Sequence, residues 1–527
     1  MAAKNILYVI ADQHNAGWLG CEGHRQVHTP HLDAFAGEGV RFTGAYAQNP
    51  ICTPSRVSIL SGQYCLNHGY YGLSGPAPRC GNAFRHFRAQ GYRTAAFGKL
   101  HLPESPRNWI ADDVERFGDT YETADGVIHA SVYFEELEAK GIRHLEDSYH
   151  NPHHYGKASI ARDARPSELP YEMTQEYWCM REALRFIDEG EGGRPFFLQV
   201  ALQRPHHPLL PQQRFWDWYA EDLALPPTLD QDPSGRPPHF RKGYDWFREM
   251  PWEYAGPGDG FYEGARRAWR GTLACVSQID DVFGRLLEGL RERGLDEDTI
   301  IVYGSDHGAY HGIHGIPEKS PGICSEEVCR VPMIWQVPGC PKGRVETALA
   351  ENIDIFPTLA ALCGLPEPQW TDGRDLSPLL RGEDGPVREL AVTENVWSRA
   401  IRWGRWRFVH YQPETFDDEA FADYGPTGDY GELYDIEADP DEMRNLYYDK
   451  AYAEVVHACR RKLLEWMIRS RRSVTSLPAV REATVPVERA ESPDYPGERR
   501  SYPVEADGTA PNDAQPRNRP NVNRQYL

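Results

Sequence analysis

The fold of this chain is decided by a helix, a glycine and a buried strand that follow one another. The stretch reads Thr272-Leu-Ala-Cys-Val-Ser-Gln-Ile-Asp-Asp-Val-Phe-Gly-Arg-Leu-Leu-Glu-Gly-Leu-Arg-Glu-Arg293, then Gly294, and then Thr299-Ile-Ile-Val-Tyr303. Apolar side chains form one stripe of the predicted helix, namely Leu273, Val276, Ile279, Phe283, Leu286, Leu287 and Leu290. Gly294 ends this helix, and the apolar run after it is typical of a buried parallel strand.

Three other apolar runs have the same character and are followed by helix or turn signals: Ile6–Ile10, Thr94–Phe97 and Phe196–Leu202. Helices that alternate with buried strands indicate an α/β fold, with a large mixed, mostly parallel sheet sandwiched by helices. Because 527 residues are long for one compact domain, we expect this domain to occupy residues 1–375 and a smaller unit to follow it.

The pattern changes after Leu376. The segments Ala400–His410 and Glu432–Asp435 predict a small antiparallel sheet. A helix over Ala451–Ile468 is expected to cover this sheet with the side chains of Val455, Cys459, Leu463 and Met467. Residues 376–470 are therefore predicted to form a small C-terminal α+β subdomain.

The last segment, residues 471–527, is rich in proline and charge and poor in large aliphatic side chains. Such a tail cannot bury enough apolar surface to order itself, so it is expected to be extended or disordered. Two interpretations are open. The tail is an exposed end, or it lies across a partner subunit of a homo-oligomer, with Tyr495, Tyr502 and Tyr526 as anchors.

The overall composition excludes some classes of function. The chain carries 57 Lys and Arg against 78 Asp and Glu, a net charge of −21, which disfavours binding of nucleic acid. No apolar run approaches the roughly 20 residues that a membrane-spanning helix needs, and the N-terminus lacks the pattern of a signal peptide. The 11 cysteines are scattered, which is typical of reduced thiols. These features predict a cytoplasmic protein.

Polar residues follow two of the predicted strands at the point where each strand ends. Asp12 and Gln13 come after the first strand, and Asp306 and His307 come after the strand that ends at Tyr303. Ligands bind at the carboxyl edge of open α/β sheets, and a carboxylate beside a neutral ligand suits a divalent cation. Taken alone, Asp12 could instead cap a helix. Two such pairs after two strands favour one shared metal site.

A third polar segment reads Pro50-Ile-Cys52-Thr-Pro54-Ser-Arg56-Val-Ser-Ile-Leu60-Ser-Gly62. Pro54 is typical of the first turn of a helix, so Cys52 and Arg56 are expected near a helix N-terminus that favours an anion. The guanidinium of Arg56 could hold oxyanion oxygens in a fork. Considered without its neighbours, Cys52 would be interpreted as an ordinary buried thiol and Arg56 as a surface charge.

Two further segments carry basic and imidazole groups. They are Gly98-Lys99-Leu-His101, at the end of the predicted strand Thr94–Phe97, and Gln203-Arg-Pro-His206-His-Pro-Leu209, after the strand Phe196–Leu202. Lys319 follows the Asp306 segment. Each of these side chains alone could be solvated or could satisfy a loop.

Together these segments resemble the sulfatase family. The string Cys52-Thr-Pro-Ser-Arg56 is similar to the family's modification signature, and Gly98-Lys99-Leu-His101 and Pro205-His206-His-Pro208 are similar to two further family elements. The stretches Val27–Asp33, Gln278–Asp281, Arg330–Met333 and Glu432–Pro440 also match, so the resemblance covers nearly the whole chain up to residue 470.

The resemblance implies a mechanism. A formylglycine-generating enzyme would oxidise Cys52 to formylglycine. One hydroxyl of its hydrated form would attack the sulfate ester, and the diol would then release sulfate as it collapses back to the aldehyde. Asp12, Gln13, Asp306, His307 and the modified Cys52 would hold one divalent ion. Arg56 would fix the nucleophile, Lys99 and Lys319 would hold sulfate oxygens, His206 would protonate the leaving group, and His101 would assist collapse of the diol.

Two metal-ligand positions depart from the commonest family pattern. Many sulfatases have Asp where this chain has Gln13 and Asn where it has His307; both replacements occur in a branch that includes choline sulfatase and the phosphonate monoester hydrolases. His307 moves the preference from Ca²⁺ toward Mn²⁺, Mg²⁺ or Zn²⁺, and Ca²⁺, Mn²⁺ and Mg²⁺ are the expected candidates. The expected substrate is a small aryl, alkyl or sugar sulfate, as for an arylsulfatase. The alternatives are an enzyme that acts on a phosphonate monoester or a phosphodiester, a promiscuous enzyme that acts on both sulfate and phosphorus esters, and an inactive protein that binds sulfated ligands.

Overall fold

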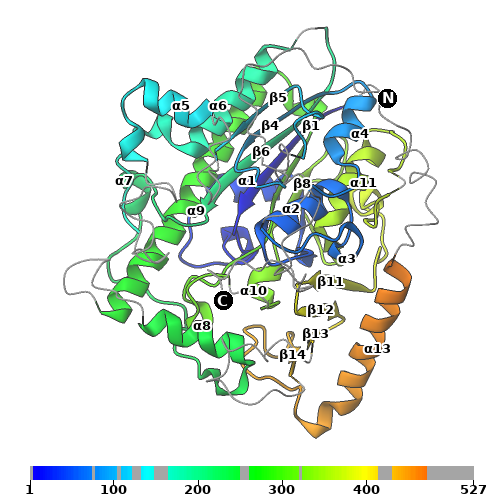
Figure 1. Cartoon of the computed structure of the whole chain (residues 1–527). Coiled ribbons are helices and arrows are strands. Elements are labelled where there is room, and N and C mark those ends of the chain that lie inside the picture. Colours follow the sequence, from blue (N-terminus) through cyan, green and yellow to red (C-terminus); the bar gives the residue numbers. More distant parts are fainter. Residues whose placement is uncertain are drawn as a thin grey trace, which may run out of the picture.

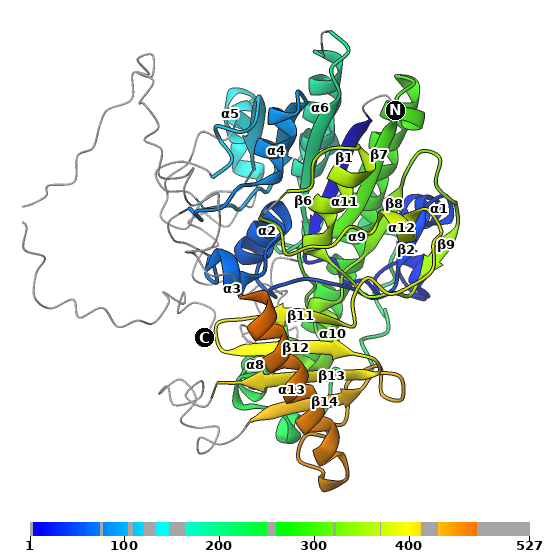
Figure 2. The same ribbon diagram turned by 90° about the vertical axis from the view of Figure 1, so that its right-hand side faces the viewer.

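The computed structural model describes residues 4–73, 77–103, 109–120, 132–146, 164–190, 192–249, 260–319, 323–368, 370–412 and 430–471. A central sheet lies between two layers of helices, and a smaller sheet below it carries one long helix (Figures 1 and 2). This architecture confirms the predicted fold class. Most of the tail, residues 472–527, lies outside the described residues, and the domain boundaries at 375 and 470 stay predictions.

Within the described residues, the main sheet has eight strands. Their order is β5 (Arg116–Asp119), β4 (Arg93–Gly98), β6 (Phe196–Pro205), β1 (Asn5–Asp12), β7 (Thr299–Ser305), β8 (Met333–Gln336), β2 (Val40–Phe42) and β9 (Arg344–Glu346). The first five run parallel, whereas β8 is antiparallel to both of its neighbours. The four strands expected from the sequence are β1, β4, β6 and β7, and they form the continuous centre of the sheet.

Two layers of helices cover the sheet, and β1 contributes alternate side chains to each. Ile6, Tyr8 and Ile10 belong to the core shared with α2 (Cys52–Ser61), α4 (Ala83–Ala89), α11 (Ile355–Leu362) and α12 (Ser377–Leu380). Leu7, Val9 and Ala11 belong to the core shared with α1 (Pro30–Gly37), α5 (Val132–Ala139), α6 (Gln175–Asp188) and α9 (Phe261–Glu292). Because both faces of β1 are buried, its polar end residues lie inside the protein.

The long helix α9 begins earlier than the predicted start at Thr272 and ends at Glu292, one residue before the predicted end. Its additional turns carry the buried residues Gly264, Ala265, Ala268 and Trp269. Except for Trp269, these are small residues, which allow close packing but give a weak apolar signal in a sequence. None of the described helices is both long enough and apolar enough to cross a bilayer.

Shorter elements complete the part of the domain that the structure describes. They are α3 (Cys65–His68), α7 (Gln213–Trp216), α8 (Pro238–Glu249), α10 (Glu326–Cys329) and the strand pair β3 (Ala45–Tyr46) and β10 (Ala350–Glu351). The 3-10 helices are η1 (Gly20–Glu22), η2 (Arg143–Leu145), η3 (Tyr171–Met173), η4 (Pro233–Gly235), η6 (Asp296–Asp298), η7 (Ile313–Gly315), η8 (Asn352–Asp354) and η11 (Lys450–Tyr452).

The C-terminal part forms the expected small antiparallel sheet and helix. Its strands, in spatial order, are β11 (Leu390–Glu394), β12 (Ser398–Trp403), β13 (Trp406–Tyr411) and β14 (Gly431–Asp435). Helix α13 (Ala453–Ser470) packs on this sheet with Val456, Cys459, Leu463 and Trp466. The prediction was wrong for Met467, which is 36% exposed, because Trp466 fills that part of the interface.

A buried arginine joins the small sheet to the main domain. The guanidinium of Arg407 on β13 is fully buried and donates to the backbone carbonyl of Cys324, just before α10. Arg236, before α8, pairs with Glu432 on β14 at 3.2 Å. These contacts fix the small sheet against the loops that lead to the carboxyl edge of the main sheet.

Candidate functional site

The polar ends of β1 and β7 lie side by side at the carboxyl edge of the main sheet. The two strands are paired in parallel with Ala11 opposite Ser305. The next residues along the chain, Asp12 and Asp306, therefore come at the same position along the sheet edge. The backbone N–H of Asp306 donates to the carbonyl of Ala11 at 3.3 Å. Adjacent parallel strands thus bring together two carboxylates that are far apart in the sequence, as the sequence predicted.

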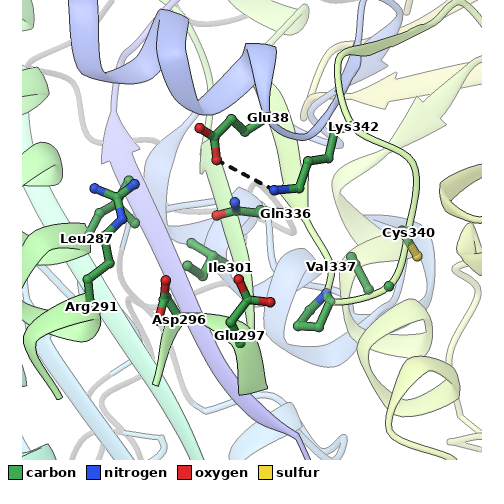
Figure 3. Close-up of a pocket in the computed structure, with 12 residues that line it drawn as sticks. Glu38, Leu287, Arg291, Asp296, Glu297, Ile301, Gln336, Val337, Cys340 and Lys342 are labelled. Carbon is green, nitrogen blue, oxygen red and sulfur yellow. Dashed lines mark ion pairs between the residues drawn. The ribbon is translucent and has the colours of Figure 1, made fainter. Parts of the chain in front are cut away.

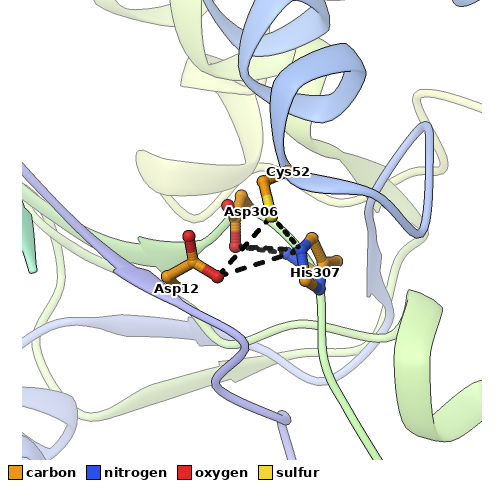
Figure 4. Close-up of side chains that lie close together, drawn as sticks. All are labelled: Asp12, Cys52, Asp306 and His307. Carbon is orange, nitrogen blue, oxygen red and sulfur yellow. Dashed lines mark hydrogen bonds and ion pairs between the residues drawn. The ribbon is translucent and has the colours of Figure 1, made fainter. Parts of the chain in front are cut away.

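Helix α2 adds Cys52 to this pair. Cys52 is the first residue of the helix and is 1% exposed. Its Sγ lies 3.3 Å from Nε2 of His307 and 3.9 Å from Oδ1 of Asp12. Figure 4 shows Asp12, Asp306 and His307 pointing toward Cys52, which lies at the end of its helix.

This cluster fits a divalent cation. One ligand atom from each of Asp12, Cys52, Asp306 and His307 lies within 4.8 Å of the others, about the spacing of ligands that share one ion at about 2.0–2.4 Å. Nδ1 of His307 donates to the carbonyl of Gly308 at 2.8 Å, so the lone pair of the neutral ring is on Nε2, which faces the cluster. Oε1 of Gln13 is buried and has no hydrogen-bond partner among the described residues.

Arg56 lies one helical turn beyond Cys52 and connects the two carboxylates. Its Nη2 donates to Oδ2 of Asp12 at 3.0 Å, and it also pairs with Asp306 and donates to the carbonyl of Lys99. Burial favours the neutral form of the Asp12 carboxyl, but Lys99, His206 and Arg56 outweigh this effect and hold its pKa well below the usual range. Burial and the charge of Asp12 raise the pKa of Asp306. A divalent cation here would relieve the repulsion between the two carboxylates.

Two lysines and one histidine also approach Cys52. Nζ of Lys99, at the end of β4, lies 2.9 Å from Oδ2 of Asp12. Burial raises the pKa of the Cys52 thiol, but Lys319, Lys99 and His307 outweigh it and hold this pKa well below the usual range. His101 hydrogen-bonds to Cys52, and burial lowers the pKa of His101 to about 4. All three predicted residues therefore lie around the predicted nucleophile.

His206 enters the same site from the end of β6. Its backbone N–H donates to the carbonyl of Asp12 at 3.2 Å, where the β1–β6 register shifts. Its Nδ1 donates to the carbonyl of His207 at 2.8 Å, so Nε2 is the nitrogen left to face Cys52, to which His206 hydrogen-bonds. Burial, Lys99 and Lys319 lower the pKa of His206. A bound anion would oppose the effect of both lysines.

Glu318 also belongs to this site, although it was not among the residues predicted from the sequence. Its carboxylate is 3% exposed and accepts a hydrogen bond from Nε2 of Gln13 at 3.1 Å. Nδ1 of His207 lies 2.9 Å from the same oxygen, and Nζ of Lys319 lies 3.6 Å from it. The signal that could have found Glu318 was its place beside Lys319, because two adjacent charged residues in a buried segment need partners on both sides.

Two cavities elsewhere are distinct from this cluster. One of about 90 Å³ is at the opposite edge of the sheet, between the start of β7 and the end of β8, where Glu38 and Lys342 form an ion pair (Figure 3). A larger open hollow of about 520 Å³ lies beside the start of α1 and the half-exposed Trp218. Neither contains a predicted site residue, since all of these converge on the cluster around Cys52.

Known proteins resemble this chain over most of its length. The family model "Sulfatase" matches residues 4–365, and the family model "N-sulphoglucosamine sulphohydrolase, C-terminal" matches residues 312–469. The multifunctional alkaline phosphatase superfamily protein PehA of Trinickia caryophylli is 28% identical over 89% of this chain and 96% of its own length. The choline-sulfatase of Rhizobium meliloti is 28% identical over 84% of this chain and 82% of its own length.

Solved structures share the fold. The phosphonate monoester hydrolase SpPMH from Silicibacter pomeroyi superposes with a TM-score of 0.73 at 22% identity and covers 90% of this chain and 97% of its own. The first family model spans well over half of the residues and includes every predicted metal and catalytic residue. The predicted enzyme class, a sulfuric ester hydrolase, is confirmed at the level of the family, and the chain belongs to the sulfatase family.

Proposed function

We propose that this protein hydrolyses a sulfate ester, with formylglycine made from Cys52 as the nucleophile and one divalent ion as cofactor. The observation that carries the proposal is the position of Cys52. Its Sγ lies 3.3 Å from His307 Nε2, in a buried cluster of metal-ligand types at a helix N-terminus. When bound by Asp12, Gln13, Asp306 and His307, the ion would acidify the nucleophilic hydroxyl and offset charge on the group that is transferred.

The buried charges around Cys52 support an anionic substrate. Three carboxylates (Asp12, Asp306 and Glu318) meet three basic side chains (Arg56, Lys99 and Lys319), so a divalent ion would leave the site positive. A positive pocket inside a chain of net charge −21 can bind a small anion that the outer surface would repel. In this proposal Lys99 and Lys319 hold the oxygens of the sulfate group and Arg56 fixes the nucleophile.

Two histidines have distinct proposed roles. His206 is the general acid that protonates the leaving alkoxide or phenoxide through Nε2, because its Nδ1 is already used by the carbonyl of His207. His101 is the base that removes a proton from the second hydroxyl as the diol collapses. Its hydrogen bond to Cys52 and its lowered pKa support this role, since a base must be neutral at working pH.

A phosphonate or phosphodiester substrate is the second candidate. The tetrahedral phosphoryl group resembles the sulfuryl group, and the similar protein PehA is named as a multifunctional member of the alkaline phosphatase superfamily. The Lys99 and His101 pair favours sulfate, because related phosphonate hydrolases generally lack it. Gln13 and His307 favour Mn²⁺ or Mg²⁺ over Ca²⁺.

The test is a substrate panel on enzyme co-expressed with a formylglycine-generating enzyme. We expect kcat/KM for an aryl sulfate to exceed that for the matched aryl phosphonate and aryl phosphodiester by at least tenfold. A preference for either phosphorus ester would replace sulfate by the second candidate. No turnover of any ester by fully modified, metal-loaded protein would overturn both.

A further inference from the structure

Gln13 is an ambiguous ligand for a metal ion because its side-chain amide has two ends of similar shape. Only the oxygen can bind a hard cation, whereas the NH₂ group would direct two hydrogens toward it. Within the described part of the chain, Oε1 of Gln13 has no hydrogen-bond partner, whereas Nε2 donates to Glu318 at 3.1 Å. The orientation of this amide therefore depends on its neighbour.

The backbone of Gln13 also restricts where its side chain can lie. Gln13 has a positive φ of 67°, and its N–H donates to Oδ1 of Asp306 at 3.2 Å. A non-glycine residue in this conformation is strained and needs support from its surroundings. Because the backbone of Gln13 is anchored, other contacts must set the orientation of its side-chain amide plane.

Glu318 is well placed to fix that amide plane. A carboxylate can only accept hydrogen bonds, so it selects the NH₂ end of the amide and turns the oxygen away from itself. The carboxylate is itself held, because Nδ1 of His207 lies at 2.9 Å and Nζ of Lys319 lies at 3.6 Å from Oε1. His207 in turn stacks on His206, with ring centroids 4.1 Å apart.

We infer that Glu318 is a positioning residue that makes Gln13 a metal ligand, by holding its amide with the oxygen toward Asp12, Asp306 and His307. The inference rests on the proposed function, because it assumes that the divalent ion binds at that cluster. Residues that orient a metal ligand commonly change metal affinity 10–100-fold when they are replaced, although they never touch the ion.

The direct test is calorimetric titration of metal-free protein with Mn²⁺, which needs no turnover. We expect Glu318→Gln to raise the dissociation constant by at least tenfold, because the introduced carboxamide can donate as well as accept. Glu146→Gln is the matched control. Glu146 is also a buried carboxylate that accepts from a glutamine, at 3.2 Å from Gln175 Nε2, and also from Tyr133. We expect this control to bind Mn²⁺ like the wild type.

A double-mutant cycle with Gln13→Glu separates orientation from general loss of structure. A carboxylate at position 13 has an oxygen at both ends, so it needs no partner to orient it. With Gln at position 13, we expect Glu318→Gln to lower the Mn²⁺ affinity at least tenfold. In the Gln13→Glu background, we expect the same change to lower it less than twofold. A merely structural role would cost the same in both.

The outcomes are separable. Equal Mn²⁺ affinity of the wild type and Glu318→Gln, or equal costs of that change in both backgrounds, would overturn the inference and leave the metal site standing. If wild-type protein bound no Mn²⁺, or if Asp306→Asn bound it as tightly as the wild type, the proposed metal site itself would fail.

Discussion

Nε of Arg56 lies 2.8 Å from Oδ2 of Asp306, and both side chains are almost completely excluded from water. The same guanidinium reaches Asp12 through Nη2, so one buried cation serves two carboxylates that also belong to the proposed metal site. In the metal-free protein, Arg56 is therefore a structural counter-ion. In the proposed reaction it also fixes the nucleophile.

This dual role gives a prediction for stability. Replacing Arg56 by Ala leaves two buried carboxylates without their shared cation, so the metal-free variant should lose about 3–5 kcal/mol of unfolding free energy. Saturating Mn²⁺ should recover part of that loss, because the ion offsets the same charges. Urea unfolding of both proteins with and without Mn²⁺ measures the effect. An equal loss under both conditions would mean that the ion and Arg56 do not share these carboxylates.

Cys52→Ala should abolish ester hydrolysis and leave the fold intact. Removing one sulfur atom at the start of α2 deletes the proposed nucleophile but little packing, so the melting temperature should change by only a few degrees. Wild-type protein co-expressed with a formylglycine-generating enzyme should be more active and lighter by about 18 Da. Wild-type turnover by Cys52→Ala would contradict the mechanism.

Removal of divalent ions should abolish activity reversibly. After treatment with a chelator, Mn²⁺ or Mg²⁺ should restore turnover of modified wild-type enzyme, whereas Asp306→Asn should need a much higher ion concentration because it loses a charged ligand. Activity assays across an ion titration measure both effects. Full activity in the presence of the chelator would contradict a metal cofactor that the chelator can remove.

Asp280 predicts a pH dependence of stability. Its buried carboxyl accepts backbone hydrogen bonds from His31 and Leu32 at the start of α1, and burial raises its pKa to about 7. The folded state therefore binds this proton more tightly than the unfolded state, so the contribution is largest at low pH and disappears as the pH rises through 7. Asp280→Asn should remove this dependence. We expect the wild type to lose about 2 kcal/mol of stability relative to the variant between pH 5 and pH 8 in urea unfolding.

Deleting the residues after Ser470 tests the predicted role of the tail. Leu464 and Ile468, on the last turns of α13, are 57% and 70% exposed, so an apolar strip lies directly before the tail. If the tail contributes to a homo-oligomer, the shortened chain should have a lower mass by light scattering and a higher KM. An unchanged mass with unchanged kinetics would show that the tail is an exposed end.

The centre of the fold and site could be predicted because the signals were strong and local. Strands β1 and β7 are apolar runs buried on both faces, and the polar residues at their ends are adjacent because parallel strands end at the same edge. By contrast, β3 and β10 contain two residues each and are paired with each other, so no periodicity could reveal them.

The partners of Glu318 could not be predicted for a different reason, although its place beside Lys319 marks it as a charged residue that needs them. It follows the loop of η7, where neighbouring backbone angles are irregular and His311 and His314 have positive φ. Its partners Gln13 and His207 come from distant parts of the sequence. Contacts that depend on the packing of such loops have no period and no fixed spacing. The end of α13 is similar, since only the packed structure decides that Trp466 and not Met467 is buried.

The burial of Cys52 also constrains when it can be modified. The walls of its site come from β1, β4, β6 and β7, and β7 is completed only when the chain has reached residue 305. Once that strand has joined β1, the thiol is 1% exposed and out of reach of another enzyme. An enzyme that carries out the proposed oxidation of Cys52 would therefore have to meet a nascent or unfolded chain, and the proposed modification would compete with folding.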